Sequence, residues 1–261
     1  MMKKKCRVVA VANQKGGVGK TTTALNLAAG LAELGRRVLL IDMDPQGNCT
    51  TGTGLELESH EPTVCEVLLN ERRAESVIHR IEAMKVDLLP ANGDLTAAEV
   101  ALMEFENRAP VLKEEIEPLL AVYQHIIIDC PPALNVLTLN ALTAADGVLI
   151  PMQCEYYALE GLTALTQTIE QIQDSVNPDL EIEGLVRTMY DVRNNLSGAV
   201  SRQLHEHFDD KLFTTVIPRN VRVAEAPSYG QSVIQYDPDS RGAIAYMGLA
   251  GEYLRRLTVP A

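Results

Sequence analysis

Short apolar runs alternate along the chain with segments in which apolar side chains recur every three or four residues. Runs such as Val38-Leu39-Leu40-Ile41 and Ile126-Ile127-Ile128 are apolar throughout, which is typical of strands buried on both faces of a parallel sheet. Strands are predicted over residues 7–13, 38–42, 86–90, 125–129, 147–152, 183–189 and 213–217. Helices are predicted over residues 21–34, 96–106, 134–144, 159–176, 199–208 and 242–257.

This alternation predicts an α/β fold, because two parallel neighbouring strands need a crossover connection between them. The expected architecture is a doubly wound, mostly parallel sheet with helices on both faces. The chain has no internal repeat, no low-complexity tract and no linker rich in Pro, Gly or Ser. We therefore expect one domain over residues 1–261.

A glycine-rich segment joins the first predicted strand to the first predicted helix. Glycines let backbone N–H groups approach an anion closely, and the helix N-terminus adds a partial positive charge. Lys20 is expected to reach the β- and γ-phosphate oxygens of a nucleotide, and the Thr21 hydroxyl to ligate Mg²⁺. The candidate nucleotide-binding residues of the loop are Lys15, Gly16, Gly17, Val18, Gly19, Lys20, Thr21 and Thr22. The predicted fold is therefore of the P-loop NTPase type.

The loop departs from the usual pattern G-x-x-x-x-G-K-[ST] at its start. The first glycine of that pattern would fall at Gln14, and a second lysine, Lys15, follows it. Because Lys20 already serves the phosphates of such a loop, Lys15 is available for a second set of phosphates or for a partner subunit.

Carboxylates follow two of the predicted strands at their carboxyl ends, where open α/β sheets bind ligands. Asp42 and Asp44 are one residue apart, so they are expected to point in opposite directions and to have different roles. Asp129 ends an apolar strand in the Walker B arrangement, whose carboxylate binds Mg²⁺, usually through a water. Cys130 is interpreted as a small buried side chain rather than a redox residue.

Composition limits the possible partners and cofactors. The formal net charge is −12, so binding to nucleic acid or to an anionic membrane would need a local basic patch. Five cysteines without a C-x-x-C pair, and no H-E-x-x-H motif, argue against a disulfide framework or a zinc site and fit a reducing cytosol. No apolar run is long enough to span a bilayer, and the start of the chain does not read as a secretory signal.

These motifs together resemble those of the deviant Walker A ATPases of the ParA/Soj/MinD family. The resemblance is carried by residues 15–22, by Asp42-Met43-Asp44-Pro45-Gln46-Gly47-Asn48 and by Asp129-Cys130-Pro131-Pro132. Residues 217–230 and 236–243 are similar to the chromosomal Soj/ParA branch in particular. The similarity covers nearly the whole chain.

The resemblance implies a role for each candidate residue. Lys15 is the signature lysine, which would reach the nucleotide of the other subunit in an ATP-sandwich dimer, and Asp44 would position the attacking water. The implied catalytic residues are Lys15, Lys20 and Asp44. The implied Mg²⁺ site consists of Thr21, Asp44 and Asp129. The implied adenine contacts are Pro218 and Asn220, and the implied contacts to the DNA backbone are Arg193 and Arg222.

By the same resemblance, the protein is expected to be a Mg²⁺-dependent ATPase that forms a homodimer when it binds ATP. The ATP-bound dimer would bind double-stranded DNA without sequence preference. It would drive chromosome or plasmid partitioning together with a ParB/Spo0J-like protein. The expected location is the cytoplasm, in association with the nucleoid.

Two related classes make different demands on the sequence. A membrane-associated regulator like MinD would need an amphipathic C-terminal helix. The tail contains Gly248, Gly251, Glu252 and a terminal Pro260, which favours a packing helix, so no stable membrane association is expected. A metal-cluster reductase of the nitrogenase iron-protein type would need cluster-ligating cysteines, and no suitable set stands out.

Overall fold

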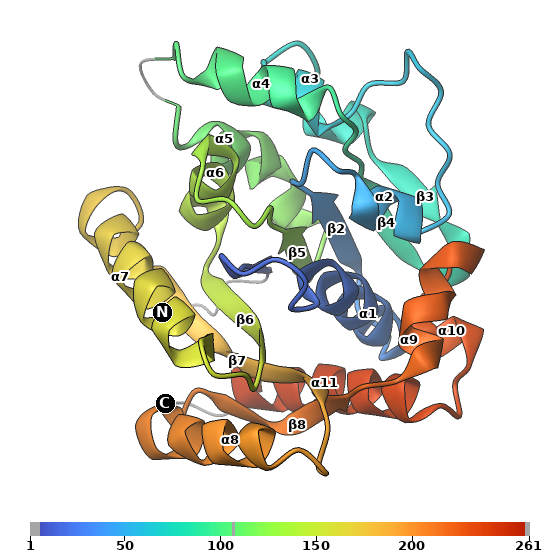
Figure 1. Cartoon of the computed structure of the whole chain (residues 1–261). Coiled ribbons are helices and arrows are strands. Elements are labelled where there is room, and N and C mark those ends of the chain that lie inside the picture. Colours follow the sequence, from blue (N-terminus) through green and yellow to red (C-terminus); the bar gives the residue numbers. More distant parts are fainter. Residues whose placement is uncertain (1–5, 106–107, 259–261) are drawn as a thin grey trace.

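A computed structural model describes residues 6–105 and 108–258 of the chain. Its strands form one eight-stranded sheet in the order β3-β4-β2-β5-β1-β6-β7-β8 (Figure 1). The strands are β1 Arg7–Val11, β2 Val38–Asp42, β3 His79–Ile81, β4 Val86–Leu89, β5 His125–Asp129, β6 Gly147–Gln153, β7 Glu181–Tyr190 and β8 Leu212–Pro218. The predicted doubly wound, mostly parallel fold is confirmed.

Each predicted strand is present, with ends that shift by a few residues. The edge strand β3 is the exception: it pairs antiparallel with β4 and was not predicted, because three residues are too few to show a period. The centre of the sheet is β1, which pairs with β5 on one side and with β6 on the other. The direction of winding reverses at β1, and sheets of this kind bind ligands outside the carboxyl ends of the strands at such a point.

The helices also follow the prediction where they are long. They are α1 Lys20–Glu33, α2 Asn48–Gly52, α3 Val64–Leu68, α4 Leu95–Leu102, α5 Val111–Ile116, α6 Val136–Ala144, α7 Ala158–Ser175, α8 Asn195–Phe208, α9 Val221–Glu225, α10 Val233–Tyr236 and α11 Arg241–Thr258. The helices α2, α3, α5, α9 and α10 were not predicted, because each is too short to establish a helical period. The helix predicted to reach residue 106 ends at Leu102, and residue 106 itself lies outside the described part.

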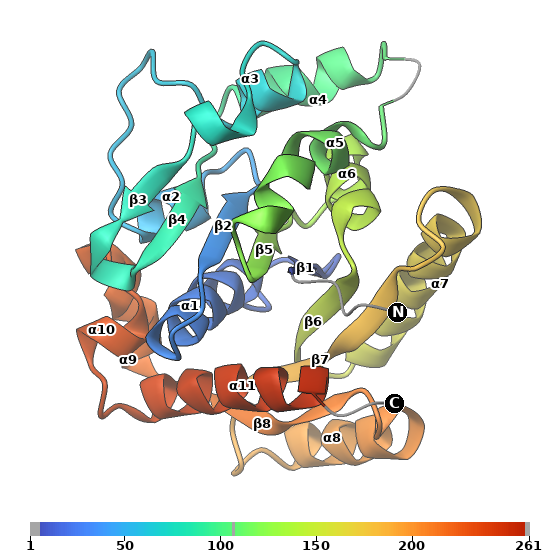
Figure 2. The same ribbon diagram turned by 180° about the vertical axis from the view of Figure 1, so that it is seen from behind.

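Helices cover both faces of the sheet. On one face, α1 and α11 pack on each other and on the strands, and on the other face lie α3 to α8 (Figures 1 and 2). Each face of the sheet forms its own hydrophobic core with the helices that cover it. Alternate residues of β1 belong to the two cores: Val8 and Ala10 face α3 to α8, whereas Val9 and Val11 face α1. This two-sided burial explains why the central strands β1, β2 and β5 are apolar at every position except for polar residues at their ends.

The last helix, α11, is a packing helix, as its composition predicts. The side chains of Leu249 and Tyr253 are fully buried. At its closest approach to α1, a Cβ added to Gly30 would lie 2.9 Å from the Cβ of Ala250, so only glycine allows this packing distance. Within the described ranges, no helix combines the length and the hydropathy needed to cross a membrane. Pro260 lies outside them.

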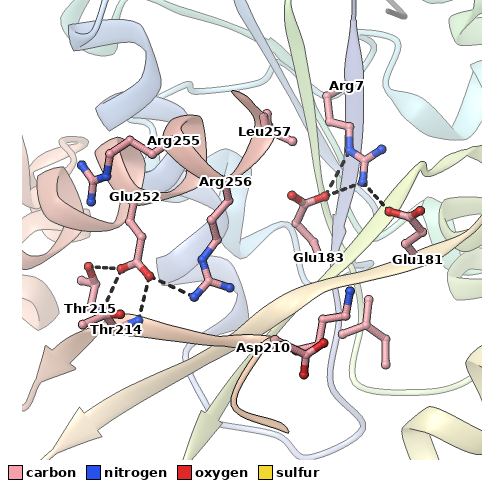
Figure 3. Close-up of a pocket in the computed structure, with 12 residues that line it drawn as sticks. Arg7, Glu181, Glu183, Asp210, Thr214, Thr215, Glu252, Arg255, Arg256 and Leu257 are labelled. Carbon is pink, nitrogen blue, oxygen red and sulfur yellow. Dashed lines mark hydrogen bonds and ion pairs between the residues drawn. The ribbon is translucent and has the colours of Figure 1, made fainter. Parts of the chain in front are cut away.

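A wide cavity of about 960 Å³ lies at the amino ends of β1, β7 and β8, at the edge of the sheet opposite to the expected ligand crevice (Figure 3). Ion pairs join its walls. The Arg7 guanidinium lies 2.7 Å from a Glu183 oxygen and 3.4 Å from a Glu181 oxygen. These contacts tie the start of β1 to the start of β7, so we assign these charged groups a structural role.

Glu252, in the same cavity wall, ties α11 to β8. Its carboxylate accepts hydrogen bonds from the amides of Thr214 and Thr215 at 2.7 and 2.8 Å and from the Thr215 hydroxyl at 2.6 Å (Figure 3). Arg256 donates a further bond at 3.1 Å. Burial opposes ionisation, but the hydrogen bonds from Thr215 and Thr214 outweigh it and lower the pKa of Glu252.

Replacement of Glu252 by Gln should therefore destabilise the protein, because an amide cannot accept from all of these donors. We expect a loss of about 1–3 kcal/mol in the free energy of unfolding, measured by urea titration near neutral pH. The control is Glu206→Gln, which changes an exposed carboxylate on α8. The pKa of Glu252 is lowered, so its stabilisation exists above the unfolded pKa and is lost as pH falls. A difference between parent and variant that did not shrink in acid would contradict this account.

Candidate functional site

The glycine-rich loop lies in the expected crevice, between β1 and α1. Gly17 and Gly19 have φ angles of +75° and +86°, which side chains other than glycine rarely adopt. Gly19 is also the N-cap residue of α1. The Lys20 ammonium folds back over the loop and donates to the carbonyl of Lys15 at 3.3 Å. The loop therefore places a buried cation next to the positive end of a helix, an arrangement that binds anions.

The loop borders a cavity of about 690 Å³. Most of the predicted phosphate and Mg²⁺ residues line it, namely Gly16, Gly17, Gly19, Lys20, Thr21, Thr22 and Asp44. Three predicted residues do not line it: Lys15, Val18 and Asp129. Val18 has a buried side chain, so it contributes to the core rather than to the cavity wall. Gln46 and Met189 line the cavity and were not predicted.

Two side chains that were not predicted stabilise the loop by donating hydrogen bonds to its backbone carbonyls. The Thr188 hydroxyl at the end of β7 donates to the Val18 carbonyl at 2.7 Å. The Gln153 amide at the end of β6 donates to the Gly17 carbonyl at 3.0 Å. Both side chains come from strands more than 130 residues away along the chain, since their separations are 170 and 136 residues. No local motif could indicate these contacts, although Gln153 directly follows one predicted strand and Thr188 lies one residue before the end of another, both on the ligand side.

A second, smaller pocket of about 170 Å³ adjoins the first. It is lined by Pro218 and Asn220, the predicted adenine contacts, and by Thr188. The two cavities share Gly19, Thr22 and Met189, so one elongated ligand could occupy both. Asn220 begins α9 and accepts a hydrogen bond from the Val223 amide at 3.3 Å, which orients its carboxamide.

The two neighbouring carboxylates after β2 have different surroundings, as their spacing predicts. Asp42 is fully buried and accepts hydrogen bonds from the Thr50 amide and hydroxyl, both at 2.8 Å, and from the Asp44 amide at 3.1 Å. Burial is the main cause that raises the pKa of Asp42 to about 6. Asp44 instead lines the cavity, and among the described residues its carboxylate accepts only the Gln46 amide, at 3.0 Å. Asp42 thus orders the loop, and Asp44 is available to a ligand.

Asp129 lies opposite Asp42 on the neighbouring strand β5. Its carboxylate is completely buried, and within the described residues neither of its oxygens has a hydrogen-bond partner. Burial raises the pKa of Asp129 well above its usual value and Asp42 adds to this, while the Thr21 hydroxyl and the Lys20 ammonium oppose it. A buried carboxylate without a partner is costly, so this position suits a cation.

The surroundings of Asp129 fit a magnesium ion that is shared with a nucleotide. Across residues 6–105 and 108–258, no three His, Cys, Asp or Glu side chains surround a common metal position. Mg²⁺ usually combines one or two carboxylates with waters and substrate phosphates, and needs no cage made only of protein. Thr21, Asp44 and Asp129 would supply the hydroxyl and carboxylate oxygens for such a site. Next to them, burial lowers the pKa of Lys20, and Asp129 opposes that shift.

The remaining predicted residues lie outside the cavity. Lys15 points away from the phosphate cavity toward the start of α7, where its ammonium lies 2.6 Å from a Glu155 oxygen. Arg193 follows β7 and forms two hydrogen bonds with Asp191, at 2.8 and 2.9 Å. Arg222, on α9, lies 2.8 Å from Glu225 and 3.2 Å from Asp237. These ion pairs were not predicted, because the sequence analysis names both arginines only as implied contacts to the DNA backbone.

Cys130 and the other cysteines are buried, as interpreted for Cys130 from the sequence. Burial raises the pKa of Cys154 to about 11, with Arg187 opposing the shift. A thiol that remains protonated and buried is a packing group rather than a nucleophile.

Comparisons with known proteins agree with these motifs. The family model described as an AAA domain matches residues 6–182. The chain is 49% identical over 252 residues to the chromosome partitioning protein ParA of Myxococcus xanthus, an alignment that covers 97% of this chain and 89% of that protein. It is 49% identical over 246 residues to the sporulation initiation inhibitor protein Soj of Bacillus subtilis, which covers 94% of this chain and 97% of that protein.

A solved structure is also similar over nearly the whole chain. The crystal structure of cobyrinic acid a,c-diamide synthase from Mycobacterium smegmatis with bound ATP analog and magnesium has a TM-score of 0.84. It is 40% identical, and the match covers 97% of this chain and 96% of that one. Its identity is lower than that of the ParA and Soj relatives. The P-loop, the carboxylates after β2 and β5 and the full-length relatives lead to one conclusion: this chain belongs to the ParA/Soj family of ATPases.

Proposed function

We propose that this protein is a Mg²⁺-dependent ATPase of the ParA/Soj type that dimerises on ATP, binds DNA without sequence preference as a dimer, and partitions a chromosome or plasmid. A ParB/Spo0J-like protein is its partner, and it works in the cytoplasm on the nucleoid. The observation that carries the nucleotide part is the pair of adjoining cavities. One is lined by Lys20 and Thr21 and the other by Pro218 and Asn220, and they share a wall.

The shape of these cavities suggests how ATP binds. The triphosphate lies on the glycine-rich loop, where Lys20 neutralises the β- and γ-phosphates. The adenine lies in the smaller pocket against Pro218, and the Asn220 carboxamide supplies its polar contact. Gly19 lines both cavities together with Thr22 and Met189, and it adds no side chain of its own where the ligand crosses from one cavity to the other.

Mg²⁺ bound to ATP would neutralise charge that develops on the phosphates. Thr21 would hold it directly and Asp129 through a water, and Asp44 lies on the same side. Asp44 has the better position to orient the attacking water, because it lines the cavity and its second oxygen has no hydrogen bond with any described residue. Lys15 of the other subunit would complete the charge around the γ-phosphate.

The charge distribution bears on DNA binding. With a net charge of −12, the protein as a whole repels DNA, so binding depends on a local group of arginines. Arg193 and Arg222 lie beyond the carboxyl ends of β7 and β8, near one edge of the nucleotide cavity. A dimer would carry both arginines on each of its two subunits. Phosphates must compete there with Asp191, Glu225 and Asp237, which pair with the arginines in this structure.

Asp129→Asn should make the nucleotide-free protein more stable and at the same time weaken Mg²⁺ binding. Asp129 is buried, its pKa is raised and its oxygens have no hydrogen-bond partner among the described residues, so replacing this carboxyl group should stabilise the nucleotide-free protein by about 1 kcal/mol and raise its Tm by roughly 2–4 °C. The same change should reduce the further rise in Tm that Mg²⁺ and ATP give to the parent. Thermal unfolding with and without Mg²⁺-ATP measures both effects, with the exposed Asp179→Asn as the control. A Tm that fell without nucleotide, or an unchanged Mg²⁺-ATP shift, would contradict the assignment.

Asp44→Ala should trap an ATP-bound dimer, because it removes the group that orients water and leaves the phosphate contacts intact. The parent should be a monomer without nucleotide. In the Asp44→Ala background, Lys15→Ala should still bind ATP but should no longer dimerise. Light scattering with ATP and Mg²⁺ gives the mass of each species. If the double variant dimerised as well as Asp44→Ala alone, Lys15 would have no role across the interface.

The Arg193→Glu and Arg222→Glu variants should each lose DNA binding and still dimerise with ATP. The control is Arg36→Glu, an exposed arginine at the opposite edge of the sheet that undergoes the same change of charge. Asp191→Asn should have the opposite effect and bind DNA a few-fold more tightly, because it frees Arg193 from its competing carboxylate. Fluorescence anisotropy with a random-sequence duplex measures these affinities. Equal affinity of Asp191→Asn and Asp179→Asn would show that the Asp191 pair does not limit DNA binding.

A further inference from the structure

The surroundings of Lys15 hold its side chain away from the cavity where the phosphates of a nucleotide bound to the same chain would lie. Its backbone is fixed, since its amide donates to the Asn13 side chain at 3.0 Å and its carbonyl accepts Lys20 at 3.3 Å. Asn13 is itself anchored to the Pro151 carbonyl at 2.8 Å. Only the side chain of Lys15 is free to move, and it reaches the turn between β6 and α7.

In that turn, Glu155 is the partner of Lys15. The ammonium and carboxylate are 2.6 Å apart, and the two side chains are 42% and 51% exposed. Lys15 also lines a hollow of about 370 Å³ beside the P-loop, together with Gln153 and Tyr157, rather than the phosphate cavity. Its charge is therefore already matched within the nucleotide-free monomer.

One ammonium cannot keep this short contact and also reach a phosphate in a second subunit. We propose that Glu155 is the resting counter-ion of Lys15, and that it competes with the nucleotide of the other subunit for this lysine. The inference rests on the proposed action of Lys15 across the dimer. Glu155 is in this sense a positioning residue: it lines neither cavity of the proposed nucleotide site, but it sets how readily Lys15 becomes available.

The size of the effect follows from the exposure of the pair. Exposed ion pairs contribute little, so the loss of one corresponds to a change of about 1.5- to 5-fold in an equilibrium constant. Each dimer must break two such pairs, one in each subunit. The dimer dissociation constant should therefore fall by roughly 2- to 25-fold when Glu155 loses its charge.

The decisive variant is Glu155→Gln in the Asp44→Ala background, with ATP and Mg²⁺ present. Its control is Glu160→Gln, because Glu160 is exposed, lines the same hollow and has no ion pair with any described residue. Both variants remove one negative charge, so they change the net charge of each subunit equally. Sedimentation equilibrium should show a tighter dimer for Glu155→Gln than for Glu160→Gln, with ATP affinity of the monomer unchanged in both.

A second readout needs no dimer. In the nucleotide-free monomer, acetylation of Lys15 by acetic anhydride, followed by mass spectrometry, should be faster in Glu155→Gln than in the parent or Glu160→Gln. Equal dimer affinities of the two Gln variants would overturn the inference, as would an unchanged rate of Lys15 labelling. If the Asp44→Ala protein never dimerised with ATP, the proposed function would fall and the inference with it. Dimerisation that did not depend on Lys15 would remove the role across the interface alone.

Discussion

The site depends on one constraint: a loop that turns its amides toward an anion must satisfy its carbonyls on the other side. Here the Thr188 hydroxyl donates a hydrogen bond to the Val18 carbonyl, and the Gln153 amide donates one to the Gly17 carbonyl. The Val18 carbonyl is buried, and leaving it without a donor would cost about 1–3 kcal/mol, so Thr188 stabilises the loop when no nucleotide is bound. The Gly17 carbonyl is exposed, so the bond from Gln153 contributes less. The same strand ends, β6 and β7, carry Glu155 and Met189. The sheet therefore positions the loop, the wall between the two cavities and the partner of Lys15 together.

The three carboxylates at the carboxyl ends of β2 and β5 show how one sheet edge produces different chemistry. Asp42 receives three hydrogen bonds and shapes the following loop, whereas Asp129 receives none from the described residues and remains costly until a cation arrives. Asp44 lies between these cases, at the cavity wall. A site of this kind is less stable empty than filled. Binding of a cation with a nucleotide would then stabilise the fold itself.

The sequence predicted the parts of the site that lie close together along the chain. The loop from Lys15 to Thr22, the carboxylates after two strands and the apolar strands could be read from local spacing, because a strand, turn and helix form a local unit. Contacts between distant segments had no local signal. Thr188 and Gln153, which donate to P-loop carbonyls, and the Lys15–Glu155 pair belong to this group. The pairs of Arg193 with Asp191 and of Arg222 with Glu225 are local, at separations of two and three residues, but they form no repeating pattern that would have revealed them. The edge strand β3 and the shortest helices were not predicted, because so few residues are not enough to show a repeating pattern of apolar positions.

The central claim is that the glycine-rich loop and the pocket around Pro218 form one ATP site. Isothermal titration of the parent and of Lys20→Ala with Mg²⁺-ATP tests it most directly. The account predicts one ATP bound per chain in the parent and no measurable binding in the variant, which should remain folded by circular dichroism. Binding of ATP by folded Lys20→Ala with the affinity of the parent would contradict the account.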